Sequence, residues 1–192
     1  STNMAKTAVN MAKSANVSTS KVLSDMASSA ESFAKFSMDG AEGFAKAAVE
    51  AAKVGASVES ILGAADKLLS FEESISAQFK AQVLTGKQIN TERARQLALD
   101  GDIAGLTQEI QSIVGSVGDI QSLNVLQRQS VADAIGISVS DLLKISRGEE
   151  VASQETVQDK IDVSNGLLRE IAGHTSETAA KDNSVEVIQP VF

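Results

Sequence analysis

A pattern that ends one helix and begins the next occurs three times in this chain, at residues 16–23, 55–62 and 136–143. Each copy has Asn or Gly, a small apolar residue, Ser, any residue, Ser or Glu, any residue, and then two aliphatic residues. Each copy follows one stretch of helical character and opens another. The repeat therefore predicts a chain of helices that are joined through one recurring corner.

The residue types in the corner explain how it turns the chain. Asn16, Gly55 and Gly136 are of the types that tolerate the left-handed conformation in which many helices end. The apolar residue after each is expected to fold back onto the helix that has just ended. The following Ser is a preferred N-cap, and Asp141 stands three residues after Ser138, at the spacing of a capping box. The closing pairs are expected to be the first buried residues of the next helix: Val22-Leu23, Ile61-Leu62 and Leu142-Leu143.

Composition supports the same architecture. The chain has 192 residues, 43% of them hydrophobic, which is enough to bury a substantial core. Its single proline, Pro190, lies near the end, so helices joined by short Gly, Ser and Asn turns are favoured. We predict an all-α fold of short to medium helices with a short extended C-terminal tail. The absence of cysteine excludes a disulfide framework and a thiolate metal site.

Apolar spacing places helices at about residues 3–15, 18–36, 39–54, 57–84, 91–99, 103–114, 122–135 and 139–146, and in an amphipathic stretch at 157–171. The longest, 57–84, has apolar residues at the three-four spacing of a coiled-coil seam, which Glu72 interrupts. We expect Ala-rich N-terminal helices over 1–56 and a central helical domain over 57–147. A linker and C-terminal helix over 148–173, then a polar linker and extended tail over 174–192, are expected to follow.

Charge and motifs exclude several classes of function. A net charge of −8 argues against a large phosphate-binding surface. His174 is the only histidine and has no second ligand at a suitable spacing. The adjacent Glu72 and Glu73 point in different directions on a helix, and the Asp100-Gly101-Asp102 turn lacks the other oxygen ligands of a calcium loop. We therefore predict that the chain is not an enzyme and has no catalytic residues, metal site, cofactor or small-molecule substrate.

The segment 131–149, which contains Gly136-Ile137-Ser138 and Arg147-Gly148-Glu149, resembles the helix-turn-helix of phage-repressor-like DNA-binding domains. The resemblance implies that the helix after Ser138 would enter the major groove. Acidic residues surround the two cations of this segment, and the same corner recurs at Asn16 and Gly55. A DNA-binding regulator centred on residues 132–147 is therefore the alternative function, and specific nucleic-acid binding is not the primary expectation. The acidic residues of this segment and its immediate end are Asp133, Asp141, Glu149 and Glu150, and the two basic residues are Lys144 and Arg147.

A second resemblance covers more of the chain. The ordered blocks at residues 71–75, 84–90, 94–102 and 123–132 resemble a segment of the large virion structural proteins of contractile-tailed bacteriophages that are described as tail tape measure proteins. The resemblance implies a C-terminal portion of a long helical protein that sets tail length inside the tail tube and is anchored at the tail hub and baseplate. It implies a virion component that is assembled in the host cytoplasm.

The same resemblance implies the partners of the chain: further copies of itself, three or a few, and the hub, tube and baseplate proteins of the tail. The C-terminal segment 185–192 has no helical pattern and could add as a strand or hook onto a hub protein. Its candidate partner-binding residues are Val185, Val187, Ile188, Pro190, Val191 and Phe192.

Overall fold

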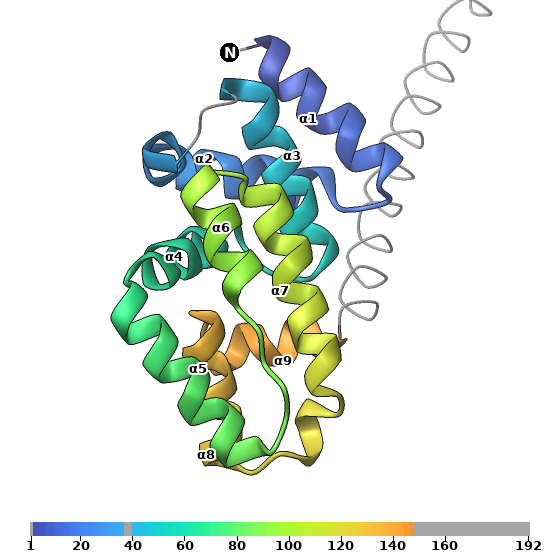
Figure 1. Ribbon diagram of the computed structural model, residues 1–192. Helices are drawn as coiled ribbons and strands as arrows, with labels where there is room; N and C mark the ends of the chain where they lie inside the picture. Colours follow the sequence, from blue (N-terminus) through green and yellow to red (C-terminus); the bar gives the residue numbers. More distant parts are fainter. Residues whose placement is uncertain (1, 37–39, 148–192) are drawn as a thin grey trace, which may run out of the picture. The chain divides into compact units, whose positions relative to one another are not determined.

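The computed structural model describes residues 2–36 and 40–147, which form nine α-helices and one short 3-10 helix without a strand (Figure 1). The predicted all-α class is confirmed. The elements are α1 (Thr2–Ser14), α2 (Thr19–Phe36), α3 (Gly40–Lys53), α4 (Val58–Leu69), α5 (Phe71–Thr85), α6 (Glu92–Asp100), α7 (Ile103–Val117), η1 (Ile120–Ser122), α8 (Val125–Ile135) and α9 (Val139–Arg147). The helix expected at 157–171, His174 and the extended tail lie outside the described residues.

All three predicted corners have the expected backbone. Asn16, Gly55 and Gly136 have φ values of 55°, 72° and 89°, and Asn16 is the one non-glycine with positive φ among the described residues. The N–H of the next residue donates to an alanine carbonyl five positions earlier, at 3.0 Å in every copy: Val17 to Ala12, Ala56 to Ala51 and Ile137 to Ala132. This is the long hydrogen bond of a Schellman motif, so the repeat in the sequence is a repeat in geometry.

The predicted serine caps are also confirmed. The hydroxyl oxygen of Ser18 accepts from the backbone N–H of Lys21 at 3.2 Å, that of Ser57 from Ser60 at 3.2 Å, and that of Ser138 from Asp141 at 3.0 Å. Each bond satisfies one of the backbone donors that a helix start leaves free.

A fourth corner joins α6 to α7 at the predicted turn of residues 100–102. Gly101 has a φ of 72°, and the Asp102 N–H donates to the Leu97 carbonyl at 3.0 Å. The Asp102 carboxylate then caps α7 by accepting from the Gly105 N–H at 2.8 Å. This corner has no apolar residue between its glycine and its cap, because Asp102 bonds to the end of α6 through its N–H and caps α7 through its carboxylate.

The helix α3 packs against α1, α2, α4 and α7. Its buried face is mostly alanine, as the sequence led us to expect, and small side chains allow neighbouring helices to approach on several sides. Phe44, the largest buried side chain of this helix, stacks on Phe33 of α2, with ring centroids 4.3 Å apart. The described residues belong to one compact unit; the boundaries expected between domains remain predictions.

The prediction of one long helix over residues 57–84 was wrong. It is broken at Ser70, whose φ of −77° and ψ of 74° are not helical, and α4 and α5 lie on either side. The expected seam divides there: Ile61 and Leu68 of α4 are buried, whereas Ile75 and Phe79 of α5 are exposed. No Gly or Pro marks the break, and beyond it α5 packs along α8, so tertiary packing rather than local propensity accompanies the change of direction.

The helix expected at 122–135 also starts later than its pattern indicated. A 3-10 turn at Ile120–Ser122 precedes it, and α8 begins after Asn124. Asn124 and Gln127 form a full capping box, in which each side chain accepts from the other residue's backbone N–H.

Candidate functional site

Four large apolar side chains line the outer face of α5 at intervals of four residues. Phe71, Ile75, Phe79 and Val83 are between 43% and 81% exposed, and α5 lies along an edge of the described helices (Figure 1). Residues four apart lie on the same face of a helix. We call these four residues the α5 stripe. A helix usually turns such a face toward the core, so the stripe is the reverse of ordinary amphipathic packing.

The inner face of α5 carries small side chains instead. Ser74 and Ala81 are buried there, and α5 packs along α8. The Gln127 side chain donates to the Leu84 carbonyl at 2.9 Å, which places the start of α8 at the end of α5. Small residues on the inner face let the two antiparallel helices lie close together.

A polar network fixes the rotation of α5. The Arg95 guanidinium of α6 donates to the Ser74 hydroxyl and to the Gln78 amide oxygen, both at 3.2 Å, and to the Thr91 hydroxyl at 2.6 Å. Thr91 is fully buried and donates to Gln78 at 2.7 Å. Turning the α5 stripe inward would break these bonds and leave buried polar groups without partners, at a cost of about 1–3 kcal/mol for each group.

Further apolar side chains lie at the end of α5 where the stripe finishes. Leu84 is partly exposed, and Val125 and Leu126, in the first turn of α8, are more than two-thirds exposed. With the α5 stripe they make seven exposed or partly exposed large apolar side chains on α5 and the start of α8. Exposed apolar side chains that gather in this way mark an interaction site.

The α8–α9 corner, which the sequence likened to a helix-turn-helix, rests on α4. A Cβ at Gly136 would lie 3.0 Å from the Ala64 carbonyl oxygen and 3.1 Å from the Ala64 Cα. The next residue, Ile137, is buried. The turn is therefore closed against another helix of the same protein.

The first turn of α9 is tied to α4 as well. The Asp141 carboxylate accepts from the Ser60 hydroxyl of α4 at 2.8 Å, from the Ser138 hydroxyl at 2.7 Å and from the Lys144 ammonium at 3.2 Å. Although burial alone would raise it, these three donors hold the pKa of Asp141 below its ordinary value. In helix-turn-helix proteins this end of the second helix reads base edges, whereas here its Asp141 is bound to Ser60 of α4.

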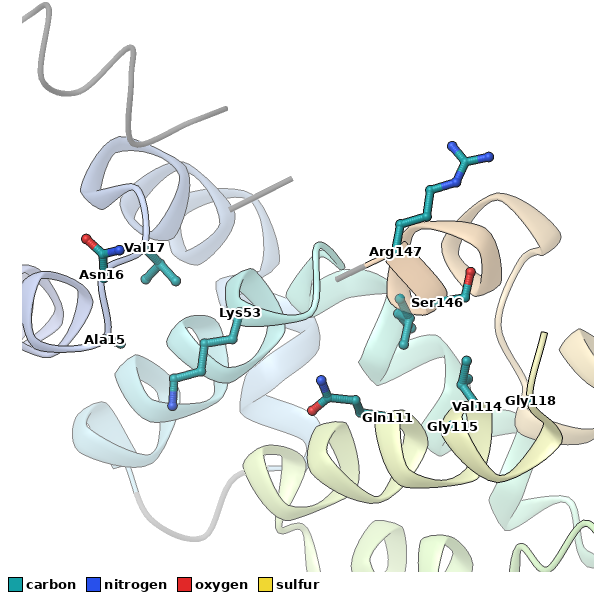
Figure 2. A pocket seen from close by; sticks show the side chains of 11 residues that line it. Ala15, Asn16, Val17, Lys53, Gln111, Val114, Gly115, Gly118, Ser146 and Arg147 are labelled. Carbon is teal, nitrogen blue, oxygen red and sulfur yellow. The ribbon is translucent and has the colours of Figure 1, made fainter. Parts of the chain in front are cut away.

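An open pocket of about 510 Å³ lies among the α1–α2 corner, α3, α7 and α9. The described residues of its lining include Lys53, Gln111 and Arg147, and none of them is a carboxylate or a histidine. Figure 2 shows the Arg147 side chain extending away from the other lining side chains. The Lys53 ammonium is bound to the Glu50 carboxylate at 2.6 Å. The pocket therefore has no pairing of nucleophile and base, and no convergent cations that would hold an anion.

Over residues 2–36 and 40–147, no group of three or more His, Asp or Glu side chains is placed to hold a metal ion. No helix in this part of the chain is long and apolar enough to cross a membrane.

The sequence-based candidates for partner binding, Val185, Val187, Ile188, Pro190, Val191 and Phe192, lie outside the described residues and stay predictions. The sequence placed Ile75 and Phe79 in a seam that Glu72 interrupts, and the charge of Glu72 argued against full burial of that seam. It did not predict that the apolar side chains of α5 lie exposed on one face.

Comparisons of the chain with protein-family models, with curated proteins and with solved structures gave no match.

Proposed function

We propose that the chain is a structural protein that acts by binding other protein chains. The α5 stripe is the observation that carries this proposal, because it places four exposed apolar side chains on one side of a helix whose orientation is fixed by polar bonds to α6. A pocket without acid-base groups and the absence of a metal cluster among the described residues are compatible with it.

We further propose that this structural role is that of a tape-measure-like component of a contractile phage tail, held by hub and baseplate proteins inside the tube. The support comes from the resemblance of residues 71–143 to such proteins. The resembling blocks fall on α5, the α5–α6 connection, α6 and α8, so they include the helices that carry the exposed apolar surface. The net charge of −8 would weaken adhesion to DNA that follows the protein through the tube.

The alternative, a DNA-binding regulator, is favoured only by the helix–corner–helix itself, with Gly136 in the left-handed conformation. Two observations oppose it: Asp141, in the first turn of α9, is bound to Ser60 of α4, and the Lys144 ammonium is bound to Asp141.

Immunogold electron microscopy tests the tail assignment. Antibodies raised against residues 2–147 would be applied to intact virions of the encoding phage and to tails opened at the baseplate. We expect gold at the tail tip after opening and peptides of the chain in the mass spectrum of purified virions. Absence of the chain from virions would contradict the tail assignment and leave the protein-binding role of α5 standing.

A further inference from the structure

We draw no further inference here: the strongest candidate, the exposed apolar stripe on the outer face of α5, belongs to the surface on which the proposed function already rests, and nothing in the structure shows what covers it.

Discussion

Single residues at the corners decide where this chain turns, and the space around each residue decides which substitutions it tolerates. Gly86 and Gly136 both end helices with positive φ, yet a Cβ at Gly86 would meet open space and one at Gly136 would meet the backbone of α4. The two positions therefore separate the cost of left-handed conformation from the cost of close packing.

We predict that Gly86→Ala lowers the free energy of unfolding by about 1–2 kcal/mol, the cost of a left-handed alanine. Gly136→Ala should cost a further 1–3 kcal/mol or so, because α4 must move away from the new methyl group. Urea unfolding of both variants, followed by circular dichroism, measures the difference. Equal losses would show that the contact between the α8–α9 corner and α4 is not tight.

Two aspartates make opposite contributions to stability as the pH changes. The pKa of Asp141 is lowered, so its stabilising effect is fully present above its ordinary value of 3.8 and is lost as the pH falls through the lowered value. Burial raises the pKa of Asp25, and the Lys21 ammonium and the Val58 N–H offset only part of that effect. Its contribution is therefore present at acid pH and lost as the pH rises through the raised value.

Accordingly, Asp141→Asn should lower the free energy of unfolding by about 1–2 kcal/mol at neutral pH, because it weakens the hydrogen bonds from Ser60 and Ser138 and the bond to Lys144. The deficit should shrink as the pH falls below 3.8. Asp25→Asn is the matched control and should cost nothing at neutral pH. Unfolding midpoints measured between about pH 3 and pH 7 check both signs; a deficit for Asp141→Asn that grows on acidification would contradict the assigned contacts.

At the scale of the element, α5 differs from the other helices in having its large apolar side chains outside. Its inner face is held by polar bonds to α6 and by small residues against α8, so its orientation does not depend on the stripe. The α5 stripe can therefore bind a partner, because the folding of the described helices does not depend on it.

We predict that Phe79→Ser changes the free energy of unfolding of the monomer by less than about 0.5 kcal/mol, as for a surface substitution. Ile61→Ala, in the buried half of the expected seam, should cost about 2–5 kcal/mol. The measurement is urea unfolding at protein concentrations low enough to keep the chain monomeric. A loss at Phe79 comparable to that at Ile61 would mean that the described helices depend on the stripe for their stability.

The sequence predicted the corners well because the signals are local: left-handed residues, serine caps and the apolar residue that folds back all lie within eight positions. It did not predict the break at Ser70, because the break depends on α8, more than fifty residues away. For the same reason the sequence showed the regular apolar spacing that includes Ile75 and Phe79. It did not show which side of α5 faces solvent. The contact of the α8–α9 corner with α4 is equally nonlocal, so the sequence could weigh the resemblance to a DNA-binding motif only by its charges and by the repeat of the corner, and not by this contact.

At the scale of the described part of the chain, helices α1–α9 form one unit with a closed polar corner at α9 and an open apolar face at α5. We assign assembly to the open face and no role in DNA recognition to the closed corner. The two assignments predict different behaviour of the same purified protein.

Sedimentation velocity of the full chain over a range of concentrations, at low and high salt and with added duplex DNA, tests this most directly. We predict concentration-dependent self-association that salt changes little and that Phe79→Glu abolishes, and no cosedimentation with DNA. A monomer that binds DNA at low salt, releases it at high salt and loses binding on charge reversal of Lys144 and Arg147 would contradict it.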